Sequence, residues 1–335
     1  MSAAIVIVGP EPEENDRLRL DSTPAPKPTG DILACVEVVG QSVLDRTIEN
    51  LWRTGVSEIS IFLDRSLIPF GFSDGGNTCL HPTNNVWRDA QAKFEEYREA
   101  GVDTLWVVRA GPYIEMEFAE MMRFHSERGP AITRAVDSVG PLEVWVVHPE
   151  RFSGSARLPE MLLIGAERYG VSGYVNRLEG PRDLRRLAVD SLTSRCRLRP
   201  QGFEMRPGVW MGQGAQIDRG ARIVAPVFIG RGVKIAEQCL ITRCSSVESN
   251  CHIDYGTVVE DSSILAGTYV GIGLDLSHSI VEGDDLLNLR HDVKLHINDP
   301  VVLRHVRAGK TRADRWLVTE FGIPEIAISV GGRTQ

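Results

Sequence analysis

The sequence predicts an α/β protein of two domains, in which a sheet covered by helices precedes a coil of short parallel strands. Short apolar segments alternate with amphipathic ones over the first 150 residues, and a six-residue repeat fills residues 211–270. A chain of 335 residues also exceeds one ordinary domain. We place the α/β domain at 1–200, the coil domain at 201–306 and a C-terminal tail at 307–335.

The elements of the first domain follow in an order typical of a mostly parallel sheet with helices on its faces. One helix begins after Ser42, a good capping residue, and ends at Gly55. Another, at 115–128, ends at Gly129, which is followed by proline. Strands are expected near residues 4–8, 58–63, 105–108, 131–136 and 142–147, and two further helices at 88–100 and 181–193.

The second domain is predicted from a large aliphatic residue that opens each six-residue unit. These positions are Met211, Ile217, Ile223, Ile229, Ile235, Ile241, Val247, Ile253, Val259 and Leu265. A period of six fits neither an α-helix nor a simple alternating strand. It fits a coil whose aliphatic side chains stack inward, turn upon turn. The pattern resembles the left-handed parallel β-helix of hexapeptide-repeat proteins, and this resemblance implies a homo-oligomer, commonly a trimer.

Composition narrows the classes of partner. The net charge is −8, which disfavours nucleic acid, and no apolar segment is long enough to span a membrane. The N-terminus lacks a basic leader, so we expect a cytoplasmic protein. The six cysteines are scattered, and those on inward coil positions are expected to be small buried groups. His291 and His296 have no clear third ligand, so no metal site is predicted there.

Several motifs of the first domain occur in a recognisable order. Arg17 and Lys27 lie ten residues apart, and residues 38–44, 54–59 and 121–129 follow as a turn into a helix, a helix end and a further helix. With the coil behind them, they resemble the sugar-1-phosphate nucleotidyltransferases (nucleotide-sugar pyrophosphorylases). The resemblance implies a Rossmann-like domain, phosphate contacts by Arg17 and Lys27, a sugar phosphate or nucleotide sugar as ligand, and Mg²⁺ if the site is active.

The phosphate loop of that family is altered in this chain. After Val8 the sequence runs Gly-Pro-Glu-Pro-Glu-Glu over residues 9–14. The prolines remove backbone N–H donors, and the carboxylates would repel a triphosphate. One such like-charge contact near 4 Å costs on the order of 4 kcal/mol at an effective dielectric of 20.

The carboxylates that would bind magnesium are also missing from their expected places. The family carries an aspartate after a glycine at the end of the strand assigned here to 104–110. This chain has Arg109-Ala110-Gly111-Pro112 there, and proline cannot bind Mg²⁺. Glu115 or Glu117 could substitute. The second family aspartate aligns with Arg177. The sequence therefore predicts an impaired or lost catalytic site in a binding, regulatory or scaffold component of sugar-nucleotide or surface-polysaccharide metabolism.

Two alternative functions remain open. One is an active sugar-1-phosphate nucleotidyltransferase with rearranged ligands. The other is an acyltransferase working from the coil, since hexapeptide-repeat acyltransferases use a histidine base, for which His252 and His278 are the candidates. The acidic turn 282–285 is interpreted as an exposed polar turn, with a cation or sugar site as the alternative.

Overall fold

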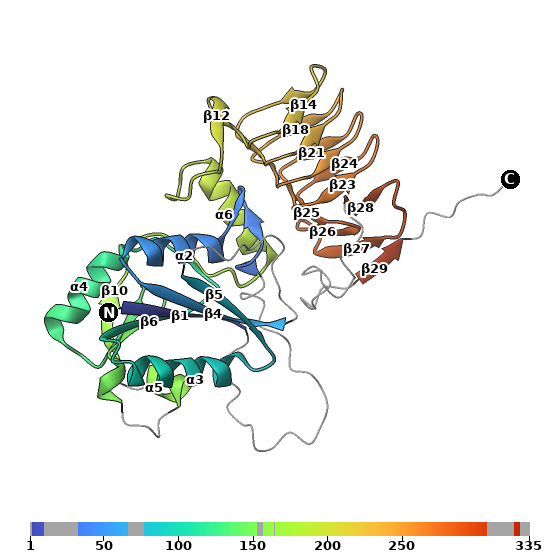
Figure 1. Cartoon of the computed structure of the whole chain (residues 1–335). Coiled ribbons are helices and arrows are strands. Elements are labelled where there is room, and N and C mark those ends of the chain that lie inside the picture. The colour runs from blue at the N-terminus through green and yellow to red at the C-terminus, as the bar shows by residue number, and fades with distance from the viewer. Residues whose placement is uncertain are drawn as a thin grey trace. The chain divides into compact units, whose positions relative to one another are not determined.

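The computed structural model describes residues 2–9, 33–65, 77–152, 157–163 and 165–306, and the backbone of 325–328 (Figure 1). The chain is a mixed α/β protein with several parallel sheets. It divides into unit 1, residues 1–35 and 43–179, and unit 2, residues 36–42 and 180–335. Arg17, Lys27 and most of the tail 307–335 lie outside the described residues.

Unit 1 contains a seven-stranded sheet in the order β10-β8-β9-β6-β1-β4-β5. Strand β1 is parallel to both of its neighbours, while β9 is antiparallel to β6 and β8. The central strand is buried on both faces, as its continuous apolar sequence predicts. The strands are β1 (Ser2–Val8), β4 (Glu58–Asp64), β5 (Thr78–Thr83), β6 (Thr104–Arg109), β8 (Ile132–Val136), β9 (Pro141–Val147) and β10 (Glu167–Gly170).

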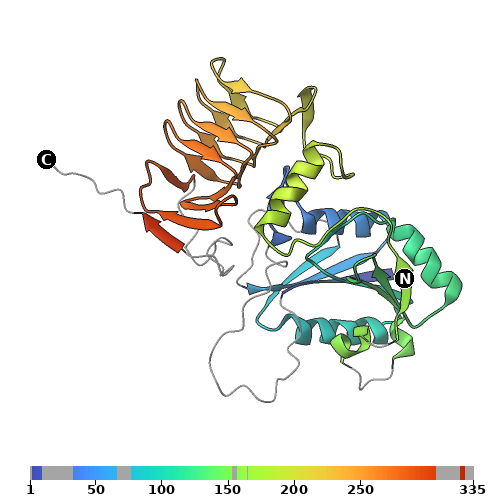
Figure 2. The ribbon, with the colours of Figure 1, turned by 180° about the vertical axis from the view of Figure 1, so that it is seen from behind.

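Helices cover both faces of this sheet. Helices α3 and α5 lie together on one face and α2 on the other (Figures 1 and 2). Phe118 of α4 packs on Trp106, with 5.3 Å between ring centroids. Gly129 ends α4 in the left-handed region at φ 61°. The helices are α2 (Val43–Arg53), α3 (Val86–Glu99), α4 (Phe118–Arg128) and α5 (Leu158–Leu163), with a 3₁₀ turn at Pro149–Arg151.

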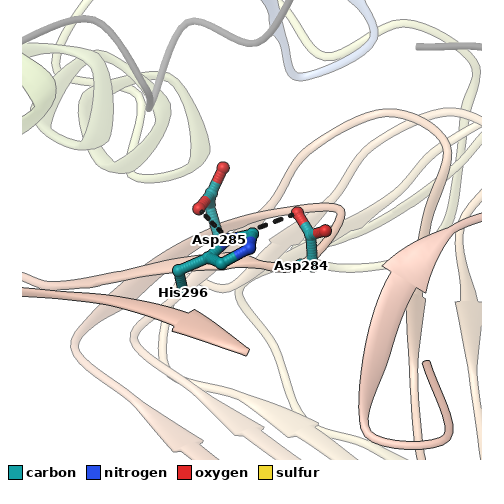
Figure 3. A group of neighbouring side chains, drawn as sticks. All are labelled: Asp284, Asp285 and His296. Carbon is teal, nitrogen blue, oxygen red and sulfur yellow. Dashed lines mark hydrogen bonds and ion pairs between the residues drawn. The ribbon is translucent and has the colours of Figure 1, made fainter. Parts of the chain in front are cut away.

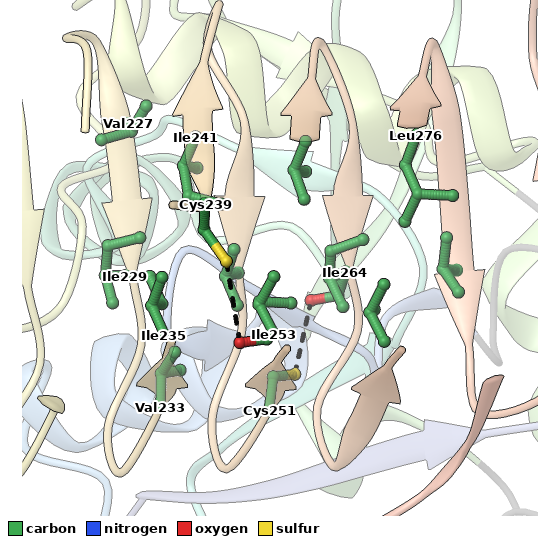
Figure 4. Packing of buried hydrophobic residues seen from close by; sticks show 14 of the residues in the cluster. Val227, Ile229, Val233, Ile235, Cys239, Ile241, Cys251, Ile253, Ile264 and Leu276 are labelled. Atoms are coloured by element: carbon green, nitrogen blue, oxygen red, sulfur yellow. Dashed lines mark hydrogen bonds between the residues drawn. The ribbon is translucent and has the colours of Figure 1, made fainter. Parts of the chain in front are cut away.

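Unit 2 is built on a coil, residues 209–282, of three parallel sheets. Each strand pairs with the strand three elements further along the chain. The sheets are β13 (Val209–Met211), β16 (Val227–Ile229), β19 (Ser246–Val247), β22 (Ser263–Ile264) and β25 (Ser279–Glu282); β14 (Gln216–Ile217), β17 (Lys234–Ile235), β20 (His252–Ile253) and β23 (Thr268–Val270); and β15 (Arg222–Ile223), β18 (Leu240–Thr242), β21 (Val258–Glu260) and β24 (Asp275–Ser277). Aliphatic side chains stack between the sheets, together with Cys239 and Cys251, each 1% exposed (Figure 4).

The last predicted six-residue unit is displaced by one position. Leu265 was expected to point inward, but Ile264 joins the core instead. Val247 pairs with Ile264, one residue closer in sequence than Ile229 is to Val247. The missing residue falls at the turn around Asp261. The repeat then continues beyond its predicted end at residue 270, through Leu276 of β24.

Antiparallel strands close both ends of the coil. At its start β12 (Phe203–Arg206) pairs with β13, and at its end β26 (Asp285–Asn288) and β27 (Val293–Ile297) extend one sheet while β28 (Leu303–His305) pairs with β23. Strand β29 (Glu325–Ile328) pairs with β27. In the described part of the chain, no helix has the length and apolar character needed to cross a membrane.

Helix α6 (Pro181–Leu192) and the hairpin β2 (Glu37–Val38) and β3 (Gln41–Ser42) belong to unit 2. The division therefore falls after Glu179, ahead of the boundary predicted at residue 200. The physical reason is that Arg185 of α6 is buried and donates a hydrogen bond to the Cys244 carbonyl of the coil.

Candidate functional site

In unit 1 the loop expected to bind phosphate begins at the carboxyl edge of the parallel strands. Gly9 follows β1, and Arg109 is the last residue of the neighbouring β6. The Arg109 Nε lies 3.5 Å from the Gly9 carbonyl oxygen, and the Ala110 N–H donates to Ile7 at 2.8 Å. The strand end at which the resemblance implies a magnesium carboxylate thus carries a guanidinium.

Arg109 shares a carboxylate with a second arginine. Its Nη1 lies 3.6 Å from one Glu143 oxygen, while Arg134 donates to the other at 2.9 Å. Arg134 also donates to the Leu142 carbonyl and lies over the Trp145 ring, 4.8 Å from its centroid. Both guanidinium groups are largely withdrawn from solvent, because their side chains are 11% and 16% exposed.

A third arginine lies at the turn between β8 and β9. Arg177 donates to Asp137 Oδ1 at 2.7 Å. Arg177 follows β11 (Val175–Asn176), which pairs with β7 (Tyr113–Ile114). Burial alone would raise the pKa of Asp137, but the N–H groups of residues 139–140 and the Arg177 guanidinium hold that pKa below its ordinary value.

These contacts form two groups of ion pairs. Arg109 and Arg134 share Glu143, and Arg177 pairs with Asp137, so both carboxylates already accept hydrogen bonds from arginine. Of the two proposed substitutes, Glu115 Oε1 accepts from the Tyr113 hydroxyl at 3.1 Å, and Glu117 is the residue before α4 and makes no side-chain hydrogen bond that caps the helix. Within the described residues of unit 1, no three side chains form a group suited to a metal ion.

The second candidate site is a corner of the coil in unit 2. His278 Nδ1 lies 2.6 Å from Asp261 Oδ2, and Arg185 donates to Asp261 Oδ1 at 2.8 Å. Arg243, Cys244, Asp261 and His278 all adopt positive φ at this corner in successive turns. A neutral imidazole that donates from Nδ1 keeps its lone pair on Nε2, so the corner presents a basic nitrogen held by a carboxylate.

The other predicted histidine lies elsewhere. His252 is on β20, in a different sheet of the coil, and its ring meets Tyr269 edge-to-face with 5.4 Å between centroids. The Tyr269 hydroxyl donates to Asp254 at 2.7 Å, and Arg304 lies over the same ring. His252 therefore belongs to an aromatic and charged ladder on the coil surface, apart from His278.

The acidic turn after β25 is buried, contrary to its interpretation as an exposed polar turn. Asp285 is 0% exposed and Glu282 is 3% exposed. Asp285 Oδ1 lies 2.9 Å from His296 Nδ1, and Asp284 lies 3.9 Å from the same nitrogen (Figure 3). No further ligand for His296 is evident from the sequence, because the antiparallel register that brings Asp285 opposite His296 cannot be seen in the spacing.

The ligand atoms of Asp284, Asp285 and His296 lie within 4.8 Å of one another, a spacing compatible with one divalent cation.

No protein-family model matches this sequence, and no curated protein matches it.

Proposed function

We propose that the chain is a nucleotidyltransferase-like protein without catalytic activity, which binds a sugar phosphate or nucleotide sugar in sugar-nucleotide or surface-polysaccharide metabolism. In this proposal unit 1 is a Rossmann-like domain of the nucleotidyltransferase type, and the coil is a left-handed parallel β-helix. The order of motifs in the sequence supports the first assignment, and the return of each strand to the same sheet supports the second.

The observation that carries the proposal is the absence of the expected metal ligands at the sheet edge, since Pro112 stands at the position of the first family aspartate and Arg177 at that of the second. Transfer of a nucleotidyl group needs Mg²⁺ held by carboxylate oxygens beside the triphosphate. Arg109 stands at the strand end instead, and Arg177 holds Asp137. A guanidinium binds phosphate through paired N–H donors but offers no oxygen to a cation.

The charge balance at the edge favours a singly or doubly charged phosphate over a metal-free triphosphate. Arg109 and Arg134 share the single carboxylate of Glu143, which leaves an excess of one positive charge. A phosphate can take the place of Glu143 between Arg109 and Arg134 and accept hydrogen bonds from both.

Equilibrium binding and turnover assays test the proposal together. We expect sugar 1-phosphates or nucleotide sugars to bind the purified protein, with no pyrophosphate released from a mixture of Mg²⁺, nucleoside triphosphate and sugar 1-phosphate. Arg109→Ala should weaken binding at least about tenfold, because hydrogen bonds to charged groups contribute about 1.5–3 kcal/mol.

Arg53→Ala is the matched control. Arg53 is exposed at the end of α2, where it pairs with Glu49, and its replacement should leave binding unchanged. Pyrophosphate release that disappears in Arg109→Ala would refute the loss of catalysis and support an active sugar-1-phosphate nucleotidyltransferase, with Mg²⁺ as its cofactor.

A second candidate function, acyl transfer from the coil, is favoured by the contact between His278 and Asp261. In such a reaction His278 Nε2 takes the proton of an acceptor hydroxyl or amine as that atom attacks a thioester carbonyl. The proton then passes to the departing thiolate. Asp261, fixed by Arg185, would orient the ring and stabilise its protonated form.

Release of free thiol from acyl-coenzyme A in the presence of amino or hydroxyl sugars tests this candidate. His278→Ala should reduce the rate at least about a hundredfold, in line with the contribution of a general base. His252→Ala removes a coil histidine that does not contact Asp261, and should retain the rate. Equal rates in the two variants would rule out His278 as the base.

We also propose that the chain forms a homo-oligomer, with a trimer as the expected state. The support is the resemblance of the coil to hexapeptide-repeat proteins. Light scattering coupled to gel filtration measures the mass directly, and a mass near that of one 37.0 kDa chain would contradict the proposal.

A further inference from the structure

A short hairpin of the N-terminal sequence is anchored on the coil. Residues 36–42, which contain β2 and β3, belong to unit 2, although the residues on both sides of them belong to unit 1. The chain therefore passes between the units at three points, next to Cys35, Val43 and Glu179. The contacts that hold the hairpin on the coil are therefore contacts within unit 2.

Two carboxylates hold the hairpin through reciprocal hydrogen bonds. Glu248 of the coil accepts from the Val39 N–H with Oε1 at 3.0 Å and from the Gly40 N–H with Oε2 at 2.8 Å. Glu37 of the hairpin accepts from the Ser249 N–H at 3.2 Å. Each partner thus supplies a side-chain acceptor to the backbone of the other.

The shape of the hairpin turn makes this arrangement specific. Val39 and Gly40 both have positive φ, 49° and 93°, which turns their adjacent N–H groups toward one acceptor. A Cβ at position 40 would lie 2.9 Å from Phe228 Cζ, so only glycine fits there. The Val39 carbonyl accepts from the Gln201 N–H at 2.9 Å, which fixes the other side of the turn.

Glu248 is 1% exposed. Burial and the negative charge of Glu37 raise the pKa of Glu248 to about 8, against the opposing effect of the N–H groups of Gly40 and Val39. A side-chain hydrogen bond with Ser246 also opposes the rise in the Glu248 pKa. The buried Cys251 lies within reach of both carboxylates, and burial, followed by their charges, raises the pKa of its thiol, which therefore stays neutral.

We propose that Glu248 and Glu37 form a proton-controlled clasp, which holds the hairpin 36–42 on the coil at acidic pH and weakens as the pH rises. The cause is that a second ionised carboxylate must be accommodated beside Glu37 in a site closed to water. The consequence is a hairpin that detaches more readily from the coil within unit 2 in alkaline solution.

Proton linkage determines the direction of the pH dependence of clasp opening and the pH range over which it occurs. The ordinary pKa of the Glu248 carboxyl is 4.5 and its pKa in the closed clasp is about 8. Between these values the closed clasp holds a proton that the open one has lost. The equilibrium constant for opening therefore rises by up to about tenfold per pH unit over this range and levels off above it.

Amide hydrogen exchange of the whole chain between pH 5.5 and 9.5 tests the clasp. After division by intrinsic exchange rates, the opening constants at Val39 and Gly40 should climb with a slope near one decade per pH unit and flatten above about pH 8. The Gly230 amide, bonded to Val247 at 2.7 Å within the coil, serves as the internal reference. Opening constants that stay level at the hairpin across this range would overturn the proposal.

Two variants separate the clasp from a general loss of stability. Glu248→Gln keeps one acceptor oxygen but no longer titrates, so the pH slope should vanish. Glu37→Gln removes the repelling charge, so the plateau should begin at lower pH. Glu237→Gln, on an exposed part of the coil, should behave as wild type. A full wild-type slope in both clasp variants would also refute the assignment.

Discussion

Asp261 binds Arg185 through one carboxylate oxygen and His278 through the other, at 2.8 and 2.6 Å. The Arg185 side chain is 7% exposed, so Asp261 supplies the counter-charge that keeps a guanidinium inside the protein. This carboxylate occupies the turn at which the six-residue repeat loses one residue. Asp261 therefore lies at the irregular turn of the coil and also binds α6 through Arg185.

Replacing Asp261 with alanine should destabilise unit 2. Arg185 would remain buried with the Cys244 carbonyl and the Ser263 hydroxyl as its remaining partners. We expect a loss of about 1.5–3 kcal/mol in the free energy of unfolding, the contribution typical of a hydrogen bond to a charged group. Urea unfolding measures it. Arg243→Ala, which breaks an exposed pair with Glu260, should cost less than about 1 kcal/mol.

The coil could be predicted in most of its length because each inward position demands an aliphatic side chain at a constant spacing. Ile235, Ile241 and Ile253 all occupy the core as predicted. The prediction of the inward positions was wrong at Ile264 and Leu265, which are adjacent and similarly apolar. Hydrophobicity cannot choose between such neighbours, whereas the pairing of Val247 with Ile264 decides the choice.

Gly40→Ala should weaken the docking of the hairpin more than a typical glycine substitution in the coil. Its new Cβ would contact Gln201 Cβ at 2.8 Å and Phe228 Cζ at 2.9 Å, in addition to the cost of φ 93°. We expect about 2–4 kcal/mol of destabilisation from strain and overpacking combined. Gly214→Ala is the control, since φ is also positive there but no atom lies within 4 Å. Equal losses of unfolding free energy in the two variants would exclude the steric contribution.

The lowered pKa of the buried His125 side chain should make unit 1 less stable in acid. Burial, followed by the charges of His148 and Arg151, lowers the pKa of His125 to about 4. The unfolded chain therefore binds a proton below about pH 6.5 that the folded chain does not. Stability should fall as the pH drops from 6.5 toward 4, by up to about 1.4 kcal/mol per unit.

Thermal unfolding at several pH values measures this dependence. His125→Gln does not titrate, and its amide can still form a hydrogen bond with Thr133, which contacts His125 Nδ1 at 2.8 Å in the wild type. The variant should lose the slope between pH 4.5 and 6.5. An unchanged slope would place the acid sensitivity on another group.

The candidate sites were less predictable than the fold because they depend on contacts between distant segments. Arg109 and Arg177 were identified as departures from a motif, but their partners Glu143 and Asp137 were not. Those partners come from a hairpin whose antiparallel strand gives no signal in sequence spacing. The role of Glu248 could not be predicted either, because an acidic residue in a turn of the six-residue repeat is ordinarily exposed to solvent. Only its contact with the hairpin shows that it is buried.

Glu143→Gln should strengthen anion binding at the sheet edge if the proposed ligand site is correct. The change removes one negative charge between Arg109 and Arg134 while keeping an acceptor oxygen for one of them. A like-charge contact near 4 Å costs on the order of 4 kcal/mol at an effective dielectric of 20 before screening, so at least about a fivefold gain in sugar-phosphate affinity is expected at low salt. Calorimetric titration measures the gain in affinity, and the gain should shrink as ionic strength rises.

The control is Glu167→Gln, which removes an exposed carboxylate paired with Arg128 and should leave the affinity unchanged. Weaker binding in Glu143→Gln would mean that Glu143 contacts the ligand directly and that the arginines do not form its phosphate site.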